Sequence, residues 1–165
     1  MDKTSQSTNK KALLSLAIGG FGIGLTEFVI MGILPDVANA FDVTIPVAGH
    51  FISAYALGVV VGAPTLTGFG SKYPANKVLF GLMLWFTVFN TLSAFATGYY
   101  SFITLRFLSG LPHGAFFGIG AVVAGKLSKP GKEAQGIAIM FSGLTFANLL
   151  GVPLGTYLGK HFSWN

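Results

Sequence analysis

Three ionisable side chains lie inside apolar stretches of the sequence, where a charge would be removed from water. Glu27 follows IGGFGIGLT, and Arg106 and His113 belong to SFITLRFLSGLPHGAFFGIG at residues 101–120. A carboxyl group can carry a proton, and a histidine can relay a proton or hydrogen-bond a hydroxyl group. A fixed cation favours the charged form of a nearby carboxylate. These residue types predict proton exchange and hydrogen bonding to a polar solute.

The composition of the chain predicts where these side chains are placed. Hydrophobic residues make up 52% of the 165 residues and charged residues only 9%, with 23 glycines and 16 phenylalanines. An ordinary soluble domain has about 25% charged residues. So few charges do not cover a water-facing surface, and an all-α polytopic membrane protein is predicted. The sequence has no cysteine, which excludes disulfides and thiolate metal sites.

Five apolar stretches are long enough to cross a bilayer, which takes about 20 residues in a helix. We predict membrane spans at about 13–34, 50–69, 78–97, 102–127 and 134–158, joined by short connections rich in Pro, Asp, Lys and Ser. The first span is too long for the apolar core of a signal peptide and is expected to be retained.

The basic residues mark one side of this predicted membrane protein. Eight of the ten precede the first span or lie in connections on that same side: Lys3, Lys10, Lys11, Lys72, Lys77, Lys126, Lys129 and Lys132. The other side carries Lys160, and its first connection holds Asp36 and Asp42. The positive-inside rule then predicts a multi-pass protein of the cell (inner or plasma) membrane with a cytoplasmic N-terminus. The net charge of +5 is thereby explained without a nucleic-acid partner.

The depth of the buried charges predicts that they face a shared aqueous crevice. An ionisable group in hydrocarbon costs roughly 2.5–3.5 kcal/mol and usually faces a partner or a wet cavity. By helical rise, Glu27 lies about 12 Å below the outer surface and Arg106 about 6–9 Å below it. They can meet if the first and fourth spans are neighbours. The seven-residue spacing puts His113 on the same helix face as Arg106, near the midplane. The alternatives are a snorkelling arginine, and a carboxyl and an imidazole hydrogen-bonded within the bundle.

Small residues repeat at helical spacing in the last two spans. They are Gly110, Gly114 and Gly118 in the fourth span and Gly151, Gly155 and Gly159 in the fifth. Glycine every four residues is typical of helix faces that pack closely. Pro153 removes a backbone hydrogen bond and predicts a bend in the fifth span. Asn148 lies mid-span and either lines a cavity or bonds a neighbouring helix.

A weak internal repeat relates the second and fifth predicted spans. Gly62-Ala63-Pro64 and Gly151-Val152-Pro153 each lie in the later half of a span, and Lys72 and Lys160 follow them. The two spans run in opposite directions, as in the inverted three-plus-three repeats of transporters. Such a repeat predicts a sixth helix after residue 160, so the chain is expected to be truncated before it.

Four motifs together resemble a known family. They are LTEFVIMGILPDVA (25–38), AYALGVVVGAP (54–64), RFLSGLPHGAFFG (106–118) and GVPLGTYLG (151–159). The third resembles the arginine-glycine motif and the fourth the proline-glycine motif of major facilitator superfamily antiporters. The chain is similar to the N-terminal half of such transporters, in the drug/proton antiporter group and its sugar (arabinose-type) efflux permeases.

The resemblance implies that residues 1–165 form most of one six-helix bundle, with five transmembrane helices. It implies proton-coupled efflux of a small solute, a sugar or a drug-like molecule, by alternating access. Glu27 and Arg106 would couple protons, and His113 and Asn148 would line the substrate cavity. The glycines and Pro153 would serve helix packing and gating. The implied partners are the lipid bilayer, protons, a small-molecule substrate, and the missing C-terminal half or a second chain, with no cofactor and no metal.

One motif departs from the family pattern. The stretch GFGSKYPANK (68–77) places Ser71 where the family usually has an aspartate and Lys72 where it has an arginine. The acidic member of the family's cytoplasmic charge network is therefore missing, and that gating interaction is not carried over.

Two other classes of function were weighed against transport. The sequence has no nucleophile–base pair, paired acids or phosphate-binding loop, so an enzyme is not expected. The alternative is a non-transporting fragment, or a structural or regulatory membrane subunit that needs a second chain.

Overall fold

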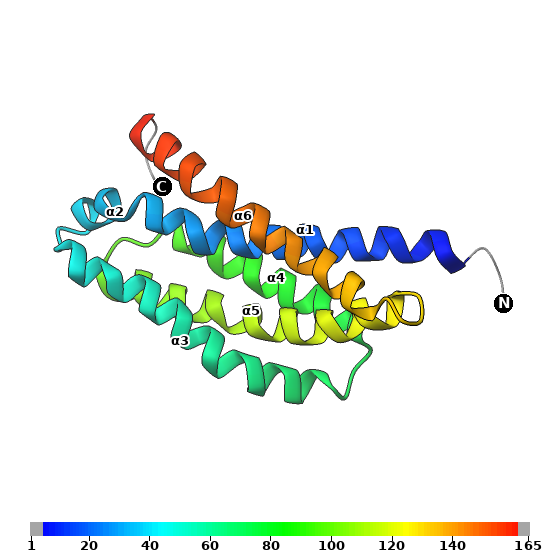
Figure 1. The fold of residues 1–165 in the computed structure, drawn as a ribbon. Helices are drawn as coiled ribbons and strands as arrows, with labels where there is room; N and C mark the ends of the chain where they lie inside the picture. Colours follow the sequence, from blue (N-terminus) through cyan, green and yellow to red (C-terminus); the bar gives the residue numbers. More distant parts are fainter. Residues whose placement is uncertain (1–4, 162–165) are drawn as a thin grey trace.

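The computed structural model describes residues 5–161, and these residues form a bundle of helices (Figure 1). Within that range there is no strand. The helices are α1 (Ser5–Gly32), α2 (Leu34–Ala40), α3 (Ile45–Gly70), α4 (Ala75–Ser93), α5 (Tyr99–Leu127) and α6 (Glu133–His161). Five of them, all except α2, are long and apolar enough to span a membrane. This confirms the all-α, five-span fold class.

The short helix α2 was not expected from the sequence. The first span was predicted to run to residue 34, whereas α1 ends at Gly32 and α2 begins at Leu34. Pro35 lies in the first turn of α2, where its missing N–H costs nothing because that group has no helical partner anyway. Val37 and Ala38 of α2 are buried. The connection after α1 is thus a packed element rather than an open loop.

Helix packing follows the predicted inverted repeat. The second span, α3, packs along the fourth, α5, and the fifth span, α6, packs along the first, α1 (Figure 1). The third span, α4, lies against α5. If the spans form two three-helix units, the second helix of each unit therefore packs on the first helix of the other unit. An inverted repeat produces this exchange of partners.

Glycines allow the backbones of α3 and α5 to come into direct contact. A Cβ added at Gly62 would overlap the carbonyl oxygen of Leu111, and one added at Gly110 would overlap that of Tyr55. At Gly114 an added Cβ would lie 2.6 Å from the Ala63 Cβ atom. Small residues are the usual means of such close packing between membrane helices.

The other glycines of the two predicted faces differ in their surroundings. At Gly118 an added Cβ would make only an ordinary contact, 3.7 Å from Thr67 Oγ1. Gly155 faces α1, and a Cβ there would lie 2.8 Å from Val29 Cγ1. Gly151 faces Leu25 at 3.3 Å from its Cδ1 atom. Gly151 and Gly155 of α6 thus face α1, whereas Gly110 and Gly114 of α5 face α3.

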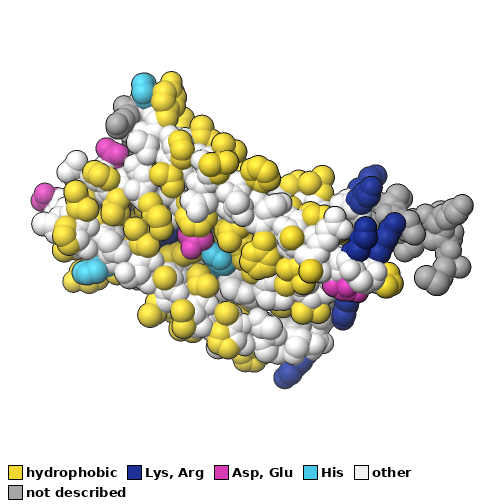
Figure 2. Space-filling view, viewed as in Figure 1, with side chains coloured by type: hydrophobic (Ala, Val, Ile, Leu, Met, Phe, Trp, Pro, Cys, Tyr) yellow, Lys and Arg dark blue, Asp and Glu magenta, His cyan; other side chains and the backbone are white. Residues whose placement is uncertain are grey.

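The charged side chains separate the two ends of the bundle. Figure 2 shows lysines gathered at the end where α1 begins, which we call the basic end. Its described members are all exposed: Lys10, Lys11, Lys72, Lys77, Lys126, Lys129 and Lys132. Asp36 and Asp42 lie at the opposite end. Lys3 and the side chain of Lys160 fall outside the described residues.

Candidate functional site

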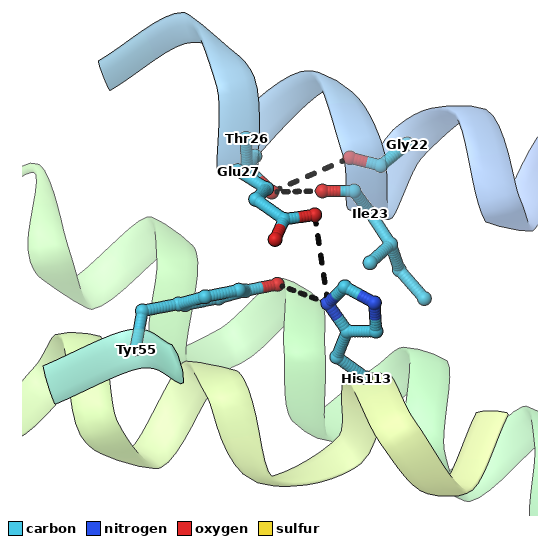
Figure 3. A network of polar contacts seen from close by, with 6 residues as sticks. All are labelled: Gly22, Ile23, Thr26, Glu27, Tyr55 and His113. Atoms are coloured by element: carbon cyan, nitrogen blue, oxygen red, sulfur yellow. Dashed lines mark hydrogen bonds and ion pairs between the residues drawn. The ribbon is translucent and has the colours of Figure 1, made fainter. Parts of the chain in front are cut away.

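A cluster of four polar side chains joins α1, α3 and α5 between the two ends of the bundle. Glu27 comes from α1, Tyr55 from α3, and Arg106 and His113 from α5. Figure 3 shows Glu27, Tyr55 and His113 pointing toward one another. His113 lies 13 residues before Lys126, or about 20 Å from the basic end by helical rise.

His113 contacts two partners through one ring nitrogen. Its Nδ1 atom lies 3.1 Å from the hydroxyl oxygen of Tyr55 and 3.9 Å from Oε2 of Glu27 (Figure 3). One nitrogen holds at most one hydrogen. When Nδ1 is bare, it accepts from the Tyr55 hydroxyl; when it is protonated, it donates to an oxygen and favours a charged Glu27. Whether Nδ1 of His113 carries a proton therefore decides whether it pairs with Tyr55 or with Glu27.

Arg106 lies over the face of the Tyr55 ring. Its side chain is only 4% exposed, and its guanidinium carbon stands 4.4 Å above the ring centroid of Tyr55. The negative face of an aromatic ring attracts a cation, most strongly away from water. Among the described residues, none accepts a hydrogen bond from Arg106 Nε. Tyr55 thus contacts both the cation and the histidine.

Glu27 and Arg106, which the sequence predicts can reach each other, are connected indirectly in the structure. Of the described residues, only His113 brings a basic nitrogen within 4 Å of a Glu27 carboxylate oxygen, and the contact is an ion pair when the histidine is protonated. A chain of contacts through His113 and Tyr55 connects the acid to the arginine. The first and fourth spans, α1 and α5, are in contact, but α1 packs more extensively on α6.

Exposure is graded across the cluster. The Glu27 side chain is 27% exposed and that of His113 is 11% exposed. Tyr55 is 2% exposed and Arg106 4%. Glu27 is therefore the member most open to its surroundings, and the arginine is enclosed behind Tyr55. Arg106 also borders a separate cavity of about 330 Å³ between α1, α4 and α5, whose polar lining includes Asn90 and Ser93.

Tyr55 is the member of the cluster that the sequence did not single out. It lies within AYALGVVVGAP, a stretch that carries part of the family likeness. A signal was present, because Gly58 and Gly62 follow at three and seven residues and lie on its helix face. That face packs against α5. A tyrosine hydroxyl on a closely packed face needs a partner from the other helix.

Asn148, predicted to line the substrate cavity, comes from a helix that supplies none of these four side chains. It is on α6, and its side chain is exposed. Pro153 lies inside α6 and is also exposed. Over the part of the chain that the structure describes, no group of three or more His, Asp or Glu side chains is placed to hold a metal.

Comparison with known proteins places the chain among transporters. The sequence pattern of the Major Facilitator Superfamily matches residues 16–165. The chain is 50% identical to AraJ of Escherichia coli K12 over 155 residues, and 51% identical over 152 residues to the inner membrane transport protein YdhP of the same strain. It is 31% identical over 152 residues to a chloramphenicol resistance protein of Streptomyces lividans.

These relatives are longer than the chain. The matches cover 94% of the chain and 39% of AraJ, and 92% of the chain and 39% of YdhP. For the chloramphenicol resistance protein the shares are 92% and 39%. The family pattern covers most of the chain. The helices of the chain form a partial bundle of the type found in this family. The chain therefore belongs to the Major Facilitator Superfamily of membrane transporters.

Proposed function

We propose that the protein containing this chain exports a small solute, a sugar or a drug-like molecule, in exchange for protons by alternating access. The basic end faces the cytoplasm in this proposal, because lysines are retained on that side of a membrane. The chain provides one bundle, and the second half of the protein, or a second chain, would complete the transport path.

The contact between Glu27 and His113 carries this proposal. Two groups that can each hold a proton lie 3.9 Å apart within an apolar bundle. Ionisable groups at such depth usually mark ion or substrate pathways, since they are costly to keep in a membrane. Family membership alone implies transport but no particular coupling ion. The half-buried pair of Glu27 and His113 gives the reason for choosing protons.

The cluster suggests how proton and solute could compete. Glu27 is charged when water or a protonated His113 stabilises it, and neutral when the helices close over it. A solute with hydroxyl groups can replace Tyr55 as the hydrogen-bond partner of His113. Arg106, held on the Tyr55 ring, keeps a positive charge next to this site. Loss of the proton from Glu27 and binding of the solute to His113 would then alternate within the same cluster.

The relatives support two classes of solute without choosing between them. One is named as a chloramphenicol resistance protein, which supports a drug-like molecule. The sequence motifs resemble sugar efflux permeases. The apolar bundle with a few convergent polar groups suits either class.

A transport assay in vesicles tests this proposal. The full-length protein carrying this chain would be reconstituted with a pH gradient imposed across the vesicle membrane, and radiolabelled L-arabinose and chloramphenicol would serve as probes. We expect accumulation of at least one probe that collapses when an ionophore removes the gradient. Uptake that is equal with and without the gradient would contradict proton coupling. No movement of any probe from a broader set of sugars and drugs would favour a structural subunit.

The hydroxyl group of Tyr55 provides a more specific prediction. Tyr55→Phe keeps the ring beneath Arg106 but removes the partner of His113 Nδ1. Since one hydrogen bond in a membrane protein is worth about 0.6 kcal/mol, stability should change little. We expect gradient-driven transport to fall several-fold and its pH profile to shift, because His113 is then left with Glu27 alone.

Tyr99→Phe is the matched control for that substitution. Tyr99 also hydrogen-bonds a histidine, with its hydroxyl oxygen 2.7 Å from Nδ1 of His50, but at the far end of the bundle from the lysines. This variant should retain the wild-type pH profile. Equal effects of the two substitutions would assign Tyr55 a purely structural role.

A further inference from the structure

A second cavity lies at the basic end, away from the polar cluster. It has a volume of about 320 Å³ and is bounded by the start of α1, the α5–α6 connection and the start of α6. Lys10, Lys129 and Lys132 line it, and all three side chains are exposed. Lys10 comes from α1, whereas Lys129 and Lys132 come from the α5–α6 connection, so the three lysines do not follow a single helix face.

The rest of the cavity lining is partly apolar and partly polar. Leu13, which is 7% exposed, Leu127 and Ile139 form its apolar part, and Ser128 and Gln135 add polar groups. The cavity therefore combines positive charge with an apolar wall. A small hydrated anion would contact the polar side chains alone and leave the apolar wall uncovered.

The lysines of this cavity have no acidic partner in its described lining. Among the side chains that the structure describes, none of those lining the cavity is acidic. The nearest acid in sequence, Glu133, uses its Oε1 atom to accept a hydrogen bond from the Gly131 N–H at 3.1 Å. That carboxylate is held by the backbone of the connection.

Exposed apolar side chains continue from the cavity along α1. Lys10, Leu14 and Ile18 are spaced at four residues and share a helix face. Leu14 is 58% exposed and Ile18 is 62% exposed. A molecule with a charged head at Lys10 can thus extend an apolar tail over this face, in the direction that leads into the bilayer.

We propose that this cavity binds the headgroup of an anionic phospholipid from the leaflet at the basic end. The phosphate group lies among Lys10, Lys129 and Lys132, and the glycerol and the start of an acyl chain lie on Leu13 and Ile139. Basic pockets between membrane helices recognise such headgroups. The volume suits one headgroup, since small-molecule sites begin at about 300 Å³. The lipid would bridge α1 and α6.

A pair of charge-matched variants tests the site. The variant K10Q/K129Q/K132Q removes the three lysines of the cavity. The control K72Q/K77Q/K126Q removes three exposed lysines of the same end that do not line it. Each full-length chain would be purified in neutral detergent and titrated with phosphatidylglycerol or phosphatidylcholine, with bound lipid counted by native mass spectrometry. Thermal unfolding without added lipid checks that each variant is folded.

We expect the wild-type chain to retain one phosphatidylglycerol in preference to phosphatidylcholine. Each lysine near an anionic group is worth about 1 kcal/mol, or about fivefold in affinity, so the cavity variant should bind at least about tenfold more weakly. The control should stay within about twofold of the wild type, since its lysines only add to the surface potential. Excess inorganic phosphate should not displace the lipid.

Four results would overturn the proposal. Equal losses in the two variants would indicate diffuse attraction to the whole basic end. Unchanged binding in the cavity variant would place the lipid elsewhere. Equal retention of phosphatidylcholine would remove the role of charge, and displacement by inorganic phosphate would indicate a site for the free anion.

Discussion

Glu27→Gln is expected to abolish proton-driven export while the protein still inserts into the membrane. Glutamine has nearly the same shape and can still hydrogen-bond His113, but it has no proton to release near neutral pH. The 3.9 Å contact between the carboxylate and His113 Nδ1, which is an ion pair when His113 is protonated, is then lost. Without a carboxyl group that gains and loses a proton, the proton gradient cannot drive transport through this site.

Two measurements separate loss of coupling from loss of folding in that variant. Exchange of labelled for unlabelled solute across vesicles needs no proton gradient and should persist in Glu27→Gln, whereas uphill export should not. Asp42→Asn is the control, because Asp42 is exposed and its φ of 51° is a conformation that asparagine also adopts. Uphill export that continues at the wild-type rate in Glu27→Gln would remove this residue from the mechanism.

Gly62→Ala is expected to cause the largest loss of stability from a single added carbon atom. The new Cβ would overlap the carbonyl oxygen of Leu111, a backbone atom that no side-chain rotation can move. Helices α3 and α5 would have to separate along their main contact. Overpacking of this kind costs about 1–3 kcal/mol, occasionally more, and a backbone clash belongs at the upper end.

Gly68→Ala is the matched control on the same helix. A Cβ at Gly68 would meet nothing within 4 Å. Thermal unfolding in detergent should show a clear drop in the midpoint for Gly62→Ala and none for Gly68→Ala. Equal midpoints would mean that α3 and α5 do not pack as closely as described.

The two predictions concern one region of the molecule. Leu111, which faces Gly62, is two residues from His113. Tyr55 lies on the same face of α3 as Gly58 and Gly62. Separation of α3 from α5 would therefore also pull Tyr55 away from His113 and Arg106. We expect Gly62→Ala to reduce gradient-driven transport even where some protein remains folded.

The sequence alone was sufficient for the class of fold and for much of the helix placement. Hydrophobic length is a local property, so all five predicted spans correspond to long helices. Helix ends were less predictable: α3 begins at Ile45, five residues before the expected start, because Pro46 fits the first turn of a helix. The separate helix α2 was missed because it is too short to give an apolar period.

The sequence by itself also determined which side chains are the chemically unusual ones. Glu27, Arg106 and His113 stand out because a charged or titrating group is rare and costly in an apolar span. The grouping of lysines at one end likewise follows from span counting alone. These features depend on residue type and position along the chain, and both can be read without coordinates.

Only the tertiary structure determined which of these side chains contact one another. The rotation and crossing of α1, α3 and α5 bring Glu27 to His113 rather than directly to Arg106. They also place Tyr55 in contact with both the histidine and the arginine. The same geometry makes Gly110 and Gly114 essential contacts while Gly118 has room. A shift of a few ångströms between helices exchanges such partners, and nothing local in the sequence sets that distance.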